Sequence, residues 1–223
     1  MLHWCSLSHP GLLEVAARSI PGSAHPYEDR ILADDKVGLF AVADGVTHSS
    51  QGSGAVAAEL ALSLLREYFS GDLVAAIGKV HQIAVRRREE DSTIGETTLT
   101  AVAVDEGRLL VGNVGDSPAY LVRAKNMRGL IQEDKSPHGY ITQVIGYPET
   151  IHVHSTSLQL KDQDMVIVAS DGVEHVLRVS FVHQLLSMPE VSEVVDSIIQ
   201  EAKARVTGYD DDKSVIVLRV VER

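Results

Sequence analysis

A run of apolar residues occupies positions 38–43, GLFAVA, and stops at Asp44-Gly45. A short continuous apolar run that ends in a turn dipeptide is typical of a buried β-strand. Two later apolar runs also end close to a glycine and a carboxylate, one shortly before Asp116 and one shortly before Asp171. Because each carboxylate stands at the mouth of a buried strand, we expect several negative charges to meet at one edge of a sheet.

The spacing of apolar residues predicts three long helices around these strands. In the first, over 55–69, Val56, Leu60, Leu64 and Tyr68 recur at every fourth position. With Ala57, Ala61 and Leu65 beside them, they predict the stripe that faces a core. The other two helices are predicted over 73–88 and 191–204. Strands are predicted over 97–104, 108–114, 119–122, 152–157, 165–169 and 214–221.

The link between two of these strands predicts their pairing. Asp105-Glu106-Gly107 separates 97–104 from 108–114. This indicates antiparallel neighbours joined by a three-residue loop, with glycine at the left-handed position of a bulge. Strands that cluster in runs between long helices favour an α+β fold with antiparallel sheets covered by helices.

Composition and charge exclude several classes of protein. The 223 residues include 20 Lys and Arg against 31 Asp and Glu, a formal net charge of −11, which disfavours nucleic acid and membrane surfaces as partners. Cys5 is the single cysteine, and no basic leader or long apolar run is present, so we expect a cytoplasmic protein. No repeat, low-complexity tract or linker divides the chain, so we expect one domain over 1–223.

Two further acidic groups lie next to predicted strands. Asp210, Asp211 and Asp212 precede the last strand, and Glu28-Asp29 stands near the first apolar run. Converging carboxylates repel one another and stay ionised together only beside cations, for which Mg²⁺ or Mn²⁺ are the natural choice. Asp-Gly is also an ordinary turn dipeptide, so one such group alone would indicate only a turn.

An ordered set of motifs runs through nearly the whole chain, from about residue 27 to about residue 220. The motifs are Tyr27-Glu28-Asp29-Arg30, Val42-Ala43-Asp44-Gly45, Gly54-Ala55-Val56-Ala57, Gly95-Glu96-Thr97-Thr98, Gly112-Asn113-Val114-Gly115-Asp116-Ser117-Pro118-Ala119-Tyr120, Ser170-Asp171-Gly172-Val173 and Asp211-Asp212-Lys213-Ser214-Val215. The set resembles the metal-dependent protein phosphatases of the type 2C serine/threonine class. The short connection between 130 and 152 resembles their compact bacterial form, similar to stage II sporulation protein E.

The resemblance implies a fold and a metal centre. The implied fold is a four-layer α-β-β-α sandwich of two antiparallel sheets flanked by helices, with two or three Mn²⁺ or Mg²⁺ ions at one end. In this scheme Asp44 bridges two ions, and the Gly45 carbonyl completes one of them. Asp171 and Asp211 bind the other ion. Metal-activated water would then hydrolyse phosphoserine or phosphothreonine in proteins.

The resemblance assigns further residues to the same centre. Glu28 and Asp29 would bind directly or through ordered water, and Asp116 would support a third, weaker ion or only cap a strand end. His48 stands near the expected place of a general acid, although a solvated loop histidine is the alternative. The last motif fits the family if Asp211 is the ligand, Asp212 occupies the place of an asparagine and Asp210 is a turn residue.

Some family residues are missing. The family commonly has a phosphate-binding arginine where this chain has Ala24, so Arg18, Arg30 and His25 are the candidates to replace it. His175 stands where an aspartate can bind a third metal in relatives.

The expected partner is a phosphorylated protein, for example a regulatory protein of a kinase or sigma-factor switch. One alternative is a catalytically weak relative that binds phosphoproteins as a regulatory module. Another is an acidic structural module that binds Ca²⁺. The catalytic set Asp44, Asp171 and Asp211 favours the enzyme.

Overall fold

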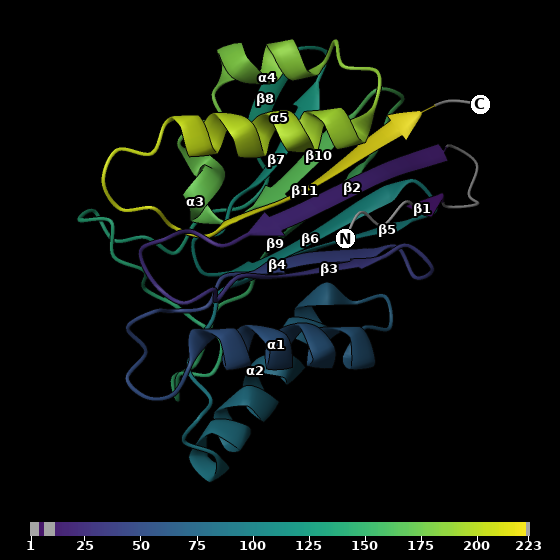
Figure 1. Ribbon diagram of the computed structural model, residues 1–223. Helices are drawn as coiled ribbons and strands as arrows, with labels where there is room; N and C mark the ends of the chain where they lie inside the picture. Colours follow the sequence, from purple (N-terminus) through teal and green to yellow (C-terminus); the bar gives the residue numbers. More distant parts are fainter. Residues whose placement is uncertain (1–4, 7–11, 222–223) are drawn as a thin grey trace.

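Two β-sheets are stacked face to face between two layers of helices (Figure 1). The computed structural model describes residues 5–6 and 12–221. The six-stranded sheet has the order β1 (Cys5–Ser6), β2 (Leu12–Ile20), β11 (Lys213–Val221), β10 (Met165–Ala169), β7 (Ala119–Arg123) and β8 (Asn126–Gly129). The five-stranded sheet has the order β3 (Arg30–Asp34), β4 (Leu39–Ala43), β5 (Leu99–Asp105), β6 (Arg108–Val114) and β9 (His154–Gln159).

All paired strands in both sheets are antiparallel. The helices are α1 (Gly54–Tyr68) and α2 (Leu73–Glu90), which cover the five-stranded sheet, and α3 (Asp171–Glu174), α4 (Val179–Leu185) and α5 (Val191–Ala204), which cover the other (Figure 1). The predicted α+β class and the α-β-β-α sandwich are confirmed. No helix in the described ranges is long and apolar enough to cross a membrane.

Two-sided burial explains the continuous apolar strands. In β10, Val166 and Val168 face the core between the sheets, whereas Ile167 faces the core under α5. In β4, Phe40 and Val42 face the core between the sheets, and the residues that alternate with them face α1 and α2. Because successive side chains of a strand point to opposite faces, a strand with a core on each side is apolar throughout.

The buried face of α1 differs from the predicted stripe. Alanines and leucines at positions 57, 58, 61, 62 and 65 are buried, whereas Val56 and Tyr68 are 42% and 38% exposed. Small alanines let the helix lie close to the sheet, so they mark the contact face better than the larger residues do. The predicted stripe is therefore confirmed at positions 57, 61, 64 and 65 and wrong at its two ends, Val56 and Tyr68.

The structure adds elements that periodicity missed. β6, β10 and α5 have the predicted bounds, but β2, β3, β8, α3 and α4 were not predicted. The turn between β5 and β6 is also tighter than expected. Asp105 pairs with Arg108, so the loop has two residues, Glu106 and Gly107, with φ angles of 45° and 76°. The prediction of a three-residue bulged loop was wrong, because both residues adopt the left-handed conformation of a tight hairpin.

Replacing Glu106 tests this turn. Because asparagine tolerates a positive φ better than glutamate, we expect Glu106→Asn to raise the free energy of unfolding by about 1 kcal/mol. Urea denaturation of the purified protein measures the change. Glu106→Ala removes the same side chain without favouring a positive φ, so an equal gain from alanine would contradict the explanation.

Candidate metal centre

The sheet topology brings the predicted carboxylates to one end of the sandwich. β4 and β6 both pair antiparallel with β5, so they run in the same direction and their ends place Asp44 and Asp116 at one edge. β3 starts at that edge, because Arg30 pairs with Ala43. In the other sheet, the end of β10 pairs with the start of β11. Asp171 therefore lies near residues 210–212, at the end of the molecule where α3 lies (Figure 1).

Hydrogen bonds from the neighbouring strand hold Asp44 in place. Its N–H donates to Thr98 Oγ1 at 3.0 Å, and its carbonyl accepts from the Thr98 N–H at 2.8 Å and the Thr97 hydroxyl at 2.9 Å. The side chain of Asp171 lies close enough for its charge to raise the pKa of Asp44. The fold thus holds two carboxyl groups from different sheets near each other.

The carboxyl groups at this end raise one another's pKa. Burial and the charges of Asp29, Asp171, Asp211 and Asp116 raise the pKa of Asp44 well above its usual value. Burial, followed by the charges of Asp211 and Asp116, raises the pKa of Asp171 to about 6. Burial also raises the pKa of Asp29 to about 7, although hydrogen bonds from Ser214 and Ser170 oppose the shift. The cluster therefore cannot be fully ionised at neutral pH without added positive charge.

Glycine allows the start of α1 to touch the turn after β4. A Cβ atom on Gly45 would lie 2.4 Å from the backbone carbon of Gly54, so neither position can hold a side chain without a shift of the backbone. Glu28 Oε1 accepts the Gly54 N–H at 3.1 Å, which places a negative charge at the helix N-terminus. This contact orients Glu28 toward the cluster.

Two buried carboxylate oxygens have no hydrogen-bond partner in the described part of the chain, namely Glu28 Oε2 and Asp29 Oδ1. The other Asp29 oxygen accepts from the Ser170 hydroxyl at 2.8 Å. Glu28 Oε2 lies 3.5 Å from His25 Nδ1, within ion-pair distance, so Asp29 Oδ1 is the one of the two that stays without a partner among the described residues. An unpartnered buried carboxylate oxygen is costly, and a cation is a natural partner for it.

The donor set as a whole fits a hard divalent cation. Between residues 12 and 221, no three side chains of His, Cys, Asp or Glu already surround one point as metal ligands do. The carboxyl groups instead lie near one another with raised pKa values, and Asp29 Oδ1 lacks a partner among the described residues. Oxygen donors that repel one another suit Mg²⁺ or Mn²⁺. The individual ligand roles of Glu28, Asp29, Asp44, Gly45, Asp116, Asp171 and Asp211 remain predictions.

Three adjacent aspartates have three different surroundings. Asp210 pairs with the ammonium of Lys213, a residue that is only 2% exposed. Asp211 Oδ1 faces His25 Nε2 at 2.8 Å. The carboxylate of Asp212 accepts backbone N–H groups of Gly22 at 2.8 Å, Glu28 at 2.7 Å and Asp29 at 3.1 Å. Asp210 is thus a counter-ion as well as a turn residue, and Asp212 holds the Glu28-Asp29 segment in place.

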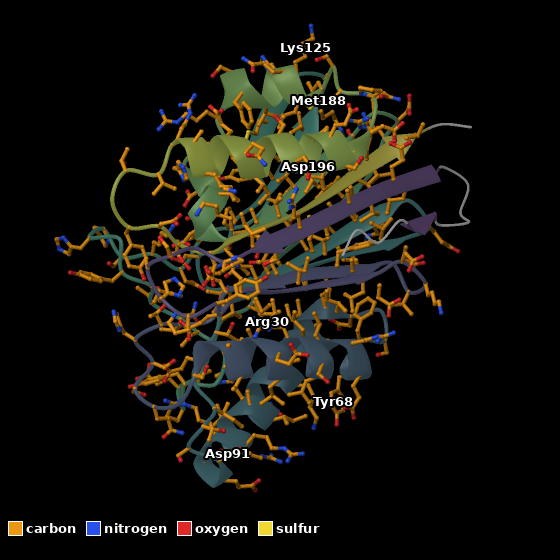
Figure 2. All side chains as sticks on the ribbon, in the orientation of Figure 1. Arg30, Tyr68, Asp91, Lys125, Met188 and Asp196 are labelled. Carbon is orange, nitrogen blue, oxygen red and sulfur yellow. The ribbon has the colours of Figure 1, made fainter. Side chains whose placement is uncertain are left out.

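His25 is the one phosphate-anchor candidate that faces the cluster. Arg18 pairs with Asp196 of α5, and Arg30 Nε lies 3.3 Å from Glu59 of α1; Figure 2 shows Asp196 on α5 and Arg30 near α1. Burial lowers the pKa of His25, but the hydrogen bonds to Asp211 and to the Pro26 carbonyl raise it by a larger amount. The pKa of His25 therefore lies above its usual value. Oxygen acceptors at both ring nitrogens favour the protonated, positively charged imidazole.

The remaining predicted residues lie at the rim of the cluster. His48 is exposed in the loop between β4 and α1, beside Thr47, which hydrogen-bonds to Tyr209. His175 lines a pocket of about 290 Å³ together with Asp171, Asp211 and Arg205. Sequence reasoning missed Lys135, whose ammonium lies 3.7 Å from Asp116 Oδ2. Its signal, a lysine that follows Glu133-Asp134, looks like an ordinary polar loop.

Comparison with known proteins identifies the class that this fold and cluster define. The catalytic domain of the serine/threonine protein phosphatase PstP, solved in complex with two manganese ions, has a TM-score of 0.81 and 26% identity over 94% of this chain and 99% of that chain. PppA of Pseudomonas aeruginosa, described as a key regulatory component of T6SS, has a TM-score of 0.81 at 22% identity, over 97% of this chain and 100% of that one, and shows the fold alone.

The sequence comparisons agree with the structural comparisons. The model of the stage II sporulation protein E family matches residues 34–221, so the chain belongs to that family. The serine/threonine protein phosphatase PstP of Mycobacterium tuberculosis is 26% identical over 240 residues, which cover 95% of this chain and 46% of the relative. The chain therefore spans about half the length of that curated relative.

The raised pKa values predict how stability depends on pH when a chelator is present. A carboxyl group whose pKa is higher in the folded state binds its proton more tightly there, so it stabilises the fold less as pH rises from about 4 toward 7. We expect Asp44→Asn to be more stable than the wild type at about pH 8, with a smaller advantage at about pH 5. Urea denaturation at both pH values measures it. Asp105→Asn, at an exposed hairpin position, is the control, and an advantage independent of pH would contradict the prediction.

The position of Asp212 predicts a cost for the residue common in relatives. Asparagine has one acceptor oxygen, whereas both oxygens of Asp212 accept backbone N–H groups. We expect Asp212→Asn to lower the free energy of unfolding by about 1–3 kcal/mol, because a buried N–H loses its acceptor. Chemical denaturation with chelator measures it beside Asp105→Asn. An unchanged stability would show that the amide replaces the carboxylate without loss.

Proposed function

We propose that this chain is a metal-dependent phosphatase that hydrolyses phosphoserine and phosphothreonine in proteins. The observation that carries the proposal is the convergence of Asp29, Asp44 and Asp171 at the strand ends of the two sheets, where the buried carboxyl groups raise one another's pKa. Membership of the stage II sporulation protein E family supports it, as does the likeness to the PstP catalytic domain solved with two manganese ions.

The proposed metal ligands are the residues at the strand mouths. Asp44 and the Gly45 carbonyl would hold one side of the centre, and Asp171 and Asp211 the other. Glu28 and Asp29 would bind directly or through water, Asp29 with its unpartnered oxygen Oδ1. When bound, Mn²⁺ or Mg²⁺ supplies Lewis acidity, which makes a coordinated water a nucleophile at neutral pH and neutralises phosphoryl oxygens.

Hydrogen bonds from neighbouring residues orient the proposed metal ligands. Hydroxyl groups of Thr97, Thr98 and Ser170 fix the backbone of Asp44 and the carboxylate of Asp29, so the ligands need little rearrangement. The pocket beside Asp171 and Asp211 opens to solvent and gives a substrate side chain access to the centre. His48, exposed on the neighbouring loop, would give a proton to the leaving serine or threonine oxygen.

One observation favours a second candidate, a regulatory module that binds phosphoproteins without efficient turnover. The place of the family's phosphate-binding arginine holds Ala24, and the guanidinium groups of Arg18 and Arg30 pair with Asp196 and Glu59. Weak phosphate anchoring slows hydrolysis but leaves the surface around the centre available for binding.

The proposed partner is a phosphorylated protein, with a regulatory protein of a kinase or sigma-factor switch as the finer suggestion, and the proposed location is the cytoplasm. The net charge of −11 supports a protein partner over nucleic acid or a membrane surface.

Phosphatase assays with controlled metal test the function. We expect hydrolysis of an aryl phosphate and of a phosphoserine peptide in Mn²⁺, loss of activity with chelator, and a loss of orders of magnitude in kcat for Asp44→Asn, because a ligand charge disappears. Asp105→Asn, far from the cluster in the β5–β6 hairpin, is the matched control. Phosphopeptide binding without turnover in saturating Mn²⁺ would replace the enzyme by the regulatory module.

A further inference from the structure

Lys135 is held by three carboxylates that come from separate parts of the chain. Its Nζ atom lies 3.0 Å from Glu174 Oε2 of α3, 3.4 Å from Glu133 Oε2 and 3.7 Å from Asp116 Oδ2 at the end of β6. The side chain is 27% exposed and that of Asp116 is 11% exposed, so the group is screened only partly by water. The arrangement is a cation inside an acidic shell.

The backbone around Lys135 is anchored to the strand end that carries Asp116. The Asp134 N–H donates to the Gly115 carbonyl at 3.0 Å, and Asp134 Oδ2 accepts the Gly115 N–H at 2.9 Å. The other Asp134 oxygen accepts from Gln143 at 2.7 Å and faces His154 Nε2 at 2.8 Å. These contacts set the distance between Lys135 and Asp116, so the pairing is part of the fold.

Asp116 connects this shell to the candidate metal centre. Asp116 follows β6, which runs in the same direction as β4, so it lies at the same edge of the five-stranded sheet as Asp44. Lys135 also pairs with Glu174 of α3, the helix that begins at Asp171. Three carboxylates within 4 Å stabilise the positive charge of the Lys135 ammonium. A permanent positive charge therefore stands at the border of the centre.

We propose that the Lys135 ammonium is a built-in cation that occupies the Asp116 side of the centre, so that the chain binds two divalent ions and reserves Asp116 for lysine. A divalent ion at the same carboxylates would be repelled by the ammonium and would have to displace it from Glu174. Removal of the ammonium leaves Asp116, Glu133 and Glu174 without a counter-ion, and this acidic group then attracts an extra divalent ion. The inference rests on the proposed divalent-metal centre.

Counting bound Mn²⁺ tests the proposal without an activity assay. Native mass spectrometry and titration of free Mn²⁺ by electron paramagnetic resonance are applied to the wild type and to Lys135→Met, which keeps an apolar stem and loses the charge. We expect two ions in the wild type and a third, weaker one in Lys135→Met. Lys135→Arg, which keeps the charge, and Lys79→Met, on exposed α2 surface, should bind two.

A double variant identifies the position of the additional ion. Adding Asp116→Asn to Lys135→Met should return the count to two. Circular dichroism checks folding, and Lys135→Gln replaces the methionine variant if that one does not fold.

The outcomes separate this proposal from the proposed function. A wild type that binds no Mn²⁺ overturns the metal centre and this inference together. A wild type with three ions, or two ions in both the wild type and Lys135→Met, overturns the inference alone. An unchanged ion count with a raised KM for aryl phosphate in Lys135→Met would show that Lys135 binds phosphate instead.

Discussion

Repulsion among the carboxyl groups at one end of the sandwich is the constraint on which the rest of the site depends. Two apolar sheets and their helices bring Asp29, Asp44 and Asp171 together, and burial then raises the pKa of each. The hydrophobic cores on both faces of β4 and β10 hold the strand ends in place against this repulsion. Burial of apolar side chains in the cores thus offsets the electrostatic repulsion among the carboxyl groups. Groups with strongly shifted pKa values are typical of functional sites.

Sequence patterns predicted the elements that have a core on each side. β10 was found with its bounds because two-sided burial makes it apolar throughout, and the central residues of β6, from Leu109 to Val111, are apolar for the same reason. β2 was missed because polar residues interrupt it. Glu14 pairs with Arg219 of β11 and Arg18 with Asp196 of α5, more than 170 positions away in the chain. Partners at that distance leave no local signal, so a strand stabilised by them looks like a loop.

Contacts between residues far apart in the chain leave no local signal, and this also explains which part of the site could be predicted from the sequence. Acidic residues at strand ends were visible, because a strand end and a carboxylate are adjacent in sequence. The surroundings of Asp210, Asp211 and Asp212 were not visible, because residues 22–29 and Lys213 determine them. The three consecutive aspartates therefore have three different electrostatic roles. Only the packing of residues 22–29 against residues 210–213 distinguishes these roles.

The positive charges near the centre are already paired. Lys213 is bound by Asp210, Lys135 by Glu174, and the imidazole of His25 by Asp211. The two lysines neutralise carboxylates at the edge of the cluster, and His25 offsets part of the charge of Asp211. Asp44 and Asp171 have no such cationic partner among the described residues, so the inner group keeps an excess of acidic side chains. In the proposed function the same divalent ions must therefore neutralise the inner carboxylates and attract the phosphoryl oxygens. Side-chain cations that are already paired attract a phosphate only weakly. Phosphate binding therefore depends on the positive charge of the bound divalent ions, so that metal binding and phosphate binding are coupled.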